Sequence, residues 1–279
     1  MGLDRRRAAM NRVVSVLLLA LGATACGSSS PTAGPARSVS PSGVSALTVT
    51  QVAVPPLPVP DYKTEGTFPR VVGTGVSLAA VNTGLSNALQ RDQQRYAPLA
   101  RQDEVTNSDS LDPSDPGVYG MYPTPSLMSA SSVVVSALIP DTELFPGGTD
   151  SNGWLAVTLQ VPSGVPVTLT GLFEDPTRGL TVLAAATKTQ VLAANSCVRN
   201  ALQDPVNGAA FATGFDPSVT NYADFALTPN GLAVGFSDDG QIANPVCGSP
   251  DAVVPYATLE PYLNTLCKKL VAGVRAPQS

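Results

Sequence analysis

The segment from residue 27 to residue 60 limits where this chain can fold. It contains seven prolines, seven serines, three glycines and one charged residue, Arg37. Such a composition offers too little apolar surface for a core and is typical of an extended, mobile linker. We therefore interpret residues 26–60 as a disordered tether with a reach on the order of 30 Å. The folded part of the chain is then expected to begin at Asp61.

The residues before this tether have the three parts of a bacterial export signal. Four arginines lie between residues 5 and 12, an apolar run covers residues 13–21, and small residues occupy positions 22–25. The stretch from residue 13 to residue 25 has 13 residues, whereas a helix needs ~20 residues to span a bilayer. Residues 1–25 are therefore predicted to be a signal peptide, with translation starting at either Met1 or Met10.

Cys26 directly follows these small residues, and the arrangement resembles the bacterial lipobox. The resemblance implies cleavage between Ala25 and Cys26, followed by diacylation of the Cys26 thiol with chains such as palmitate. The alternative is an ordinary secretory cleavage site beside an incidental cysteine. The sequence therefore predicts a lipoprotein held by its lipid on the extracytoplasmic face of the cell membrane.

The charge of the exported part restricts its partners. The whole chain has 16 basic and 21 acidic side chains. Removal of residues 1–25 takes away four arginines and one aspartate, which leaves 12 basic and 20 acidic side chains and a net charge of -8. This charge disfavours nucleic acid and anionic lipid headgroups. It suits a basic protein or cationic ligand, or simply solubility through like-charge repulsion.

The absence of histidine excludes several classes of enzyme. With no histidine in the chain, Ser-His-Asp triads, Cys-His pairs and zinc sites with imidazole ligands are excluded. The sequence also has no Gly-x-Ser-x-Gly motif, no phosphate-binding loop and no convincing pair of acids. We therefore predict no catalytic residue, no metal and no cofactor, and the chain is not expected to be an enzyme.

Hydrophobic periodicity predicts one helix and one loop in residues 61–130. Apolar residues recur at helical spacing between Gly75 and Pro98, which predicts an amphipathic helix there. Residues 101–125 have four prolines and are expected to form a long surface loop, either solvated or in contact with a basic partner. The five acids of this loop are Asp103, Glu104, Asp109, Asp112 and Asp115.

Residues 131–275 predict hairpins that alternate with helices. Two β-branched runs flank a turn-forming stretch at 146–153, and a second hairpin has Pro229-Asn230-Gly231 at its turn. A helix is expected to begin at Asp175-Pro176. The runs expected as strands cover 132–139, 154–161, 167–170, 225–227, 232–236 and 252–254, and the helices cover 175–202 and 259–274. This order indicates an α+β fold in two subdomains, residues 61–130 and 131–275, in which two or three helices pack on an antiparallel or mixed sheet.

The order of these elements resembles a family of bacterial extracellular domains. The family occurs in the lysozyme-sensing anti-sigma factor RsiV, in the non-catalytic module of the peptidoglycan deacetylase PdaC, and in secreted actinobacterial antigens. The resemblance of the C-terminal half rests on Gly147-Gly148, Gly164, Val167, Leu169, Leu172-Phe173, Phe225 to Leu232, Val254-Pro255-Tyr256 and Leu259. In the N-terminal half it rests on Tyr62, Phe68-Pro69 and Val81-Asn82.

The resemblance implies a domain that binds or senses a ligand at the cell envelope, and it does not identify that ligand. The sensor relatives bind lysozyme, a basic protein. Where the family often has alanine and histidine after its glycine pair, this chain has Thr149-Asp150. A ligand contact through that histidine is therefore not expected here. The chain also has neither the spanning helix of an anti-sigma factor nor a deacetylase domain.

Three cysteines besides Cys26 can form one disulfide in an exported protein. A short strand after Cys247 and the return of the terminal helix would bring Cys247 near Cys267. We therefore predict a Cys247–Cys267 disulfide with Cys197 as a buried free thiol, and a bridge from Cys197 to either cysteine remains the alternative. A metal or redox set is not expected, because there is no Cys-x-x-Cys spacing.

Two further residue groups have a functional and a structural interpretation. Asp238-Asp239-Gly240 could hold a cation, but it lacks the alternating ligands of a calcium loop and favours a surface turn. Trp154 could mark a binding surface, although an indole packed within a hairpin is more common.

Three functions remain open from the sequence. The first is a lipid-anchored domain that binds a protein or a cell-wall ligand without catalysis. The second is a histidine-independent hydrolase of wall polymers or lipids, which requires two acids about 5–9 Å apart in one cleft. The third is a carrier of an apolar ligand, which requires a large apolar cavity.

Overall fold

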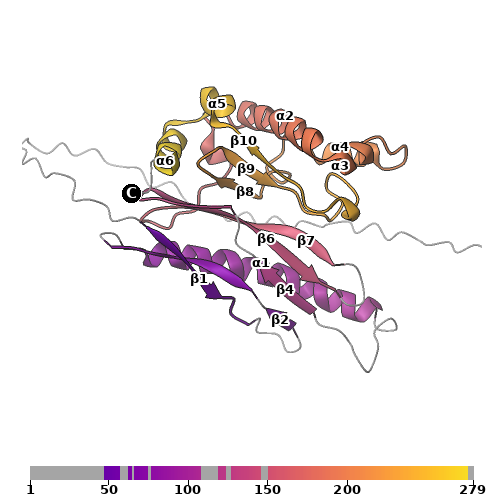
Figure 1. Cartoon of the computed structure of the whole chain (residues 1–279), viewed down its shortest axis with the longest axis horizontal. Coiled ribbons are helices and arrows are strands. Elements are labelled where there is room, and N and C mark those ends of the chain that lie inside the picture. The colour runs from indigo at the N-terminus through magenta and orange to yellow at the C-terminus, as the bar shows by residue number, and fades with distance from the viewer. Residues whose placement is uncertain are drawn as a thin grey trace, which may run out of the picture. The chain divides into compact units, whose positions relative to one another are not determined.

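The structure is a computed structural model of the chain. It describes residues 47–56, 62–64, 66–74, 77–107, 119–123, 127–145 and 150–275 (Figure 1). These residues belong to one compact unit, from Gly43 to Ser279. The fold is α+β, as the sequence predicts. The predicted signal peptide, with its cleavage site at Ala25 and Cys26, lies outside the described residues.

A five-stranded sheet is built around the long strand β6 (Val134–Leu144). β7 (Ser151–Gln160) pairs with one side of β6 along most of its length, which confirms the first predicted hairpin. The other side of β6 pairs first with β5 (Leu127–Ala130) and then with β4 (Tyr119–Pro123). β2 (Tyr62–Thr64) adds to β4 in parallel, and the other pairings are antiparallel.

β6 continues five residues beyond the strand expected at 132–139, and it does so through Pro140. β5 pairs with residues 135–138 and β4 with residues 141–144. Pro140 therefore lies at the junction between these two partner strands. Because proline lacks the N–H group that a continuous ladder requires, this junction is a position where it is tolerated.

The fold begins before Asp61, the predicted start, with a two-stranded antiparallel ribbon. It pairs β1 (Thr48–Ala53) with β3 (Thr67–Val72). β1 falls within residues 26–60, all of which were expected to be disordered. Leu47 and Val54, at the two ends of β1, are buried in the core. The physical reason is tertiary, because pairing with β3 and burial of the residues at both ends stabilise a strand in this segment despite its proline-rich surroundings.

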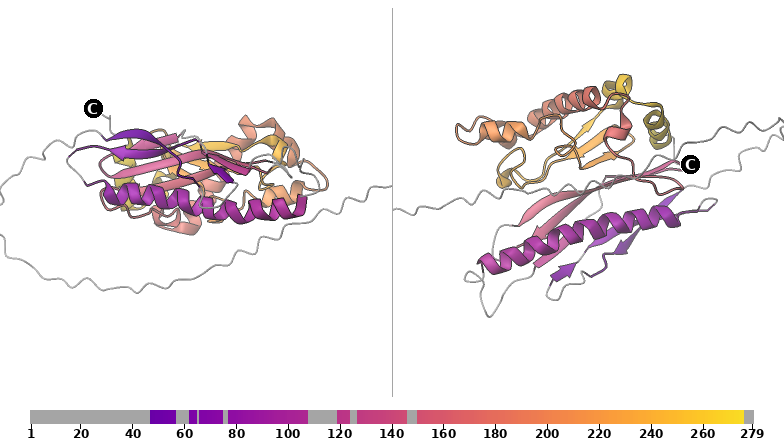
Figure 2. Two further views of the ribbon diagram at one scale, coloured as in Figure 1. Left: turned by 90° about the horizontal axis from the view of Figure 1, so that it is seen from below. Right: turned by 180° about the vertical axis from the view of Figure 1, so that it is seen from behind.

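The helix α1 (Ala79–Asn107) is longer than predicted. It continues through Pro98, so the first seven residues of the loop expected at 101–125 are helical. The side chain of Asn82 ties α1 to β3, because it accepts a hydrogen bond from the Val71 N–H and donates one to the Val71 carbonyl, both at 2.9 Å. The apolar face of α1 packs against β3 and β7 (Figure 2). Its buried apolar residues are Val81, Leu85, Ala88, Leu89, Tyr96 and Ala100, and Leu78, just before the helix, is also buried.

A second, three-stranded antiparallel sheet forms from the C-terminal half, in the order β10-β9-β8. β8 (Phe225–Leu227) and β9 (Leu232–Gly235) are the second predicted hairpin, and β10 (Asp251–Val254) is the predicted short strand. The helix α2 (Pro176–Ala194) packs on β10. The carboxylate of Asp175 caps α2 by accepting hydrogen bonds from the N–H groups of Thr177 and Arg178, which confirms the predicted helix start.

Three expected elements differ from the structure. Residues 167–170 form no strand, and a 3-10 turn spans Thr170–Leu172. The helix expected to reach residue 202 ends at Ala194, because Asn195 caps a new helix, α3 (Ser196–Ala201). The terminal helix is divided into α5 (Tyr256–Leu259), a 3-10 turn (Glu260–Tyr262) and α6 (Thr265–Arg275). A further short helix, α4 (Gly208–Thr213), follows α3.

The two sheets pack face to face through small side chains and one buried hydrogen-bond chain. Leu138 of the larger sheet packs against Ala226 and Ala233 of the smaller sheet. The Ser136 hydroxyl accepts a hydrogen bond from the Leu227 N–H at 2.8 Å and pairs with the Thr158 hydroxyl at 2.6 Å. β6 therefore contributes to the packing on both of its faces.

Candidate functional site

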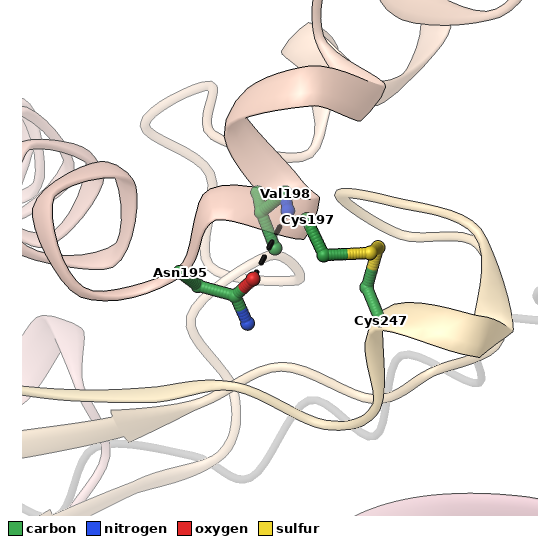
Figure 3. Close-up of a disulfide and its surroundings, with 4 residues drawn as sticks. All are labelled: Asn195, Cys197, Val198 and Cys247. Carbon is green, nitrogen blue, oxygen red and sulfur yellow. Dashed lines mark hydrogen bonds between the residues drawn. A yellow bond between two sulfur atoms is a disulfide. The ribbon is translucent and has the colours of Figure 1, made fainter.

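The structure shows a different disulfide from the one predicted. Cys197 of α3 is bonded to Cys247, which lies in the 3-10 turn Pro245–Cys247, and the two Cα atoms are 5.5 Å apart (Figure 3). The predicted Cys247–Cys267 bridge is wrong. It assumed one continuous terminal helix, whereas the break before α6 places Cys267 inside the core. Burial raises the pKa of the Cys267 thiol to about 12.

Trp154 lies in β7 and packs between the two sheets. Its indole ring covers Gly235 of β9 so closely that a Cβ atom there would lie 2.5 Å from the ring. The ring also belongs to the small cluster around Leu138 and Ala226. Trp154 is therefore a packing residue of the hairpin, as the structural interpretation predicts.

Asp238 links the turn after β9 to the start of β7. Its buried carboxylate accepts hydrogen bonds from the Ser151 hydroxyl at 3.1 Å and from the Asn152 side-chain N–H at 2.8 Å. Its own backbone N–H donates to the Asn152 carbonyl at 2.9 Å. Asp238 is therefore engaged as a structural clamp, and the neighbouring Asp239-Gly240 forms a turn.

Of the acidic segment 101–125, Asp103 and Glu104 lie on the last turns of α1. Asp109, Asp112 and Asp115 lie outside the described residues, as do Gly147-Gly148 and Thr149. Asp150, at the end of that turn, accepts a hydrogen bond from the Phe145 N–H at 3.1 Å.

The outer edge of β7 is the feature that the sequence did not predict. The backbone N–H and C=O groups of successive residues in a strand point alternately to its two edges. The residues of β7 that do not bond to β6 therefore direct both groups to the edge of β7 that faces away from β6, here called outward. Two hydrogen bonds at the end of β7 establish which residues face outward. Val161 donates its N–H to Val133 beside β6, whereas the Gln160 N–H donates outward to the Val165 carbonyl at 2.9 Å. Residues 152, 154, 156, 158 and 160 therefore face outward.

This edge is closed at its ends and open in its middle. The Thr158 carbonyl accepts from the Val167 N–H at 2.8 Å, and the Asn152 carbonyl accepts from the Asp238 N–H. Within the described part of the chain, the outward N–H and C=O groups of Trp154 and Ala156 have no hydrogen-bond partner. Four backbone groups are thus available over a short stretch.

A groove of about 450 Å³ adjoins this open stretch. Its floor is formed by residues 156–159 of β7. One wall is a face of α1, and the other includes Ala223 and Phe225 at the start of β8. From α1 the groove is lined by Ala80, Thr83, Gly84, Asn87 and Arg91. Small and polar side chains thus form the α1 wall, and the lining residues include one cation, Arg91, and no carboxylate.

A second hollow of about 460 Å³ lies between β1 and α1. It is lined mostly by apolar side chains together with Gln90, Gln93 and Gln94. Gln93 is anchored there, because its side chain donates to the Pro55 carbonyl at 3.0 Å.

A cluster of carboxylates lies apart from these lining residues, between α1 and the end of β6. Asp92, Asp141 and Glu143 each place an oxygen within 4.8 Å of the others. Arg95 donates to Asp92 through two nitrogens, each at 3.1 Å, and also donates to Glu143. Burial, and then the negative charges of Asp92 and Glu143, raise the pKa of Asp141 to about 8 against the lowering effect of Arg95.

The sequence contained a signal for part of this cluster. Val135, Ala137 and Ile139 of β6 all belong to the core under α1. Asp141 and Glu143 continue this row at the same spacing of two, which in a strand puts them on one face. Asp92, on a separate helix, could not be placed beside them without the fold.

Comparisons with known proteins give structural neighbours only. No family model and no curated protein matches the chain. A solved structure of a DUF3298 family member from Bacteroides fragilis has 14% identity and a TM-score of 0.48, covering 84% of this chain and 100% of that one. A DUF3298 family protein from Pseudomonas aeruginosa has 14% identity and a TM-score of 0.41, covering 79% of this chain and 96% of that one.

Among the described helices, none combines the length and the apolar character that a membrane span requires.

Proposed function

We propose that this chain is a lipid-anchored lipoprotein of the cell envelope whose domain binds a partner protein without catalysis. The binding site is the groove beside β7, and its ligand is an extended segment that pairs with the open edge. The observation that carries the proposal is the set of outward backbone groups without a partner in the described residues, those of Ala156, which lines the groove, and of Trp154, two residues away on the same edge.

An extended peptide is the occupant that these groups suit best. An added strand takes its affinity from main-chain hydrogen bonds and its specificity from the side chains that flank the edge. The closed ends at Asn152 and Thr158 limit the pairing to a segment of a few residues. Arg91, the one cation that lines the groove, suits an acidic or polar side chain of the bound segment.

Export of the domain is supported by two separate features. The small residues before Cys26 resemble a lipobox, and the Cys197–Cys247 bridge is of the kind that persists in oxidising compartments. The exported part has a net charge of -8. A basic partner such as lysozyme therefore remains the first protein to test, because opposite charges increase the rate of association.

A hydrolase is less well supported. The acids that converge are Asp92, Asp141 and Glu143, and none of them lines either hollow. A catalytic pair has to reach its substrate in a cleft.

A proline substitution at the edge tests the binding proposal. Because the Ala156 N–H points away from β6, Ala156→Pro removes an edge donor and leaves the β6–β7 ladder intact. Immobilised wild-type protein, Ala156→Pro and the matched control Ala156→Ser are each exposed to envelope extract and to lysozyme. We expect the wild type and the serine control to retain a partner. The proline variant should retain at least tenfold less of it. Equal retention by all three proteins would contradict a role for this edge.

The anchor has its own test. Mass spectrometry of the protein from the membrane fraction should show an N-terminal Cys26 carrying two acyl chains. A mature protein that begins at another residue, or an unmodified Cys26, would contradict the lipid anchor and leave the binding groove unaffected.

A further inference from the structure

We propose that Asp92, Asp141 and Glu143 form a binding site for one calcium ion between α1 and β6. This site is separate from the groove and does not depend on the proposed function. Its three carboxylates come from two elements that are far apart in the sequence. Asp92 lies on the helix α1, and Asp141 and Glu143 lie near the end of the strand β6.

The spacing of the oxygens suits a calcium ion. Calcium binds oxygen ligands at roughly 2.3–2.6 Å, so ligands on opposite sides of the ion are roughly 4.6–5.2 Å apart. One carboxylate oxygen of each of the three residues lies within 4.8 Å of the other two. Each residue can therefore reach a common central ion.

Asp141 supplies the observation that points to a ligand. The residue is 3% exposed, and neither of its carboxylate oxygens accepts a hydrogen bond from a donor in the described part of the chain, while the carboxylate of Asp92 lies within hydrogen-bond reach of it. The second oxygen of Asp92, Oδ2, is also buried without a partner. A buried carboxylate that lacks a partner is costly, because desolvation is not offset by a hydrogen bond or a positive charge. A cation at the centre of the cluster removes this cost for all three oxygens.

The charges of the cluster also leave room for a cation. Arg95 contacts Asp92 and Glu143 and is half exposed. Among the described residues, its one guanidinium group faces three carboxylates, and its hydrogen bonds go to Asp92 and Glu143 rather than to Asp141. Residue 153, the cross-strand neighbour of Asp141 on β7, is a glycine and offers no side-chain donor.

The ligand type selects a hard cation. All three groups are carboxylates, which suit calcium, magnesium and manganese rather than thiol-binding metals. Magnesium demands near-ideal octahedral geometry and usually keeps several waters, whereas calcium accepts irregular sites. Because Asp141 and Glu143 are at least 95% buried, the ligands have to come mainly from the carboxylates themselves, and calcium, which accepts both oxygens of one carboxylate, fits better.

Binding of this ion would link the middle of α1 to β6. The experiment follows thermal unfolding of the full protein, first freed of metal with a chelator and then supplied with calcium at about 10 mM. This concentration exceeds the roughly 0.1–1 mM dissociation constants of extracellular calcium modules. We expect the Tm to rise by about 5 °C, because the ion binds only the folded state.

Variants assign the effect to the cluster. Asp141→Asn and Asp92→Asn should lose the rise in Tm, whereas Glu174→Gln, at an exposed acid outside the cluster, should keep it. Equilibrium dialysis with calcium then counts bound ions directly on the wild type and on Asp92→Asn. One ion per wild-type chain and none on Asp92→Asn would support the site. A wild-type protein that binds no calcium, or an Asp92→Asn variant that binds it equally well, would overturn the proposal.

Discussion

At the scale of single residues, burial and hydrogen bonding separate neighbours that look alike in sequence. Ser129 and Ser136 are cross-strand partners on β5 and β6, and both are buried. The Ser136 hydroxyl has two partners, Leu227 and Thr158. The Ser129 hydroxyl is buried without a partner in the described part of the chain. No sequence pattern distinguishes the two serines, because the partners come from residues far along the chain.

Substitution of these two serines should therefore have different effects. Ser136→Ala leaves the buried Leu227 N–H and the Thr158 hydroxyl without their partner, and we expect the free energy of unfolding to fall by about 1 to 3 kcal/mol. Ser129→Ala removes a buried hydroxyl that has no partner among the described residues, and it should not lower the free energy of unfolding, because the desolvation cost of that hydroxyl is removed with it. Urea unfolding of both variants measures the difference, and equal losses would contradict the assigned hydrogen bonds.

Cys267 should be chemically inert in the folded protein. The thiolate is the reactive form, and burial raises the pKa of this thiol to about 12. Iodoacetamide at pH 8 should leave Cys267 unmodified in the native state and alkylate it after unfolding in denaturant, as read by mass spectrometry. Rapid alkylation of the native protein would show that the thiol is accessible.

At the scale of elements, local signals predicted what depends on local sequence. Both hairpins and the start of α2 follow from turn residues, alternation and the Asp175 cap. The predictions that were wrong concern where helices end and where the folded part of the chain begins. α1 passes through Pro98, and Asn195 ends α2 by capping α3. β1 forms in a proline-rich segment because it pairs with β3, a strand that begins at Thr67. Such outcomes depend on tertiary packing, which outweighs local propensity.

The Cys197–Cys247 bridge should be a major source of stability at this scale. It joins α3 to the 3-10 turn after β9 across a sequence separation of 50 residues. In the chain-entropy model, a loop of this length contributes about 4 kcal/mol by restricting the unfolded chain. We expect Cys197→Ser to lower the free energy of unfolding by about 3 to 4 kcal/mol in urea titrations. A loss below about 1 kcal/mol would contradict this.

At the scale of the whole folded unit, the strands of the β6–β7 hairpin connect two cores. Val135, Ala137 and Ile139 face the core under α1, while Val134 faces the core of the C-terminal half. The sequence predicts the α+β class because these alternations are regular. It could not predict the groove, because its floor, walls and closed ends come from four separate parts of the chain.

The open edge of β7 can be measured directly by amide hydrogen exchange. In the free protein the N–H groups of Trp154 and Ala156 should exchange fast, whereas those of Leu155 and Val157, which bond to β6, should exchange slowly. When the partner retained by the wild-type protein is added, Trp154 and Ala156 should become protected as strongly as their neighbours. If the partner binds and the exchange of both amides stays fast, strand addition at β7 is contradicted.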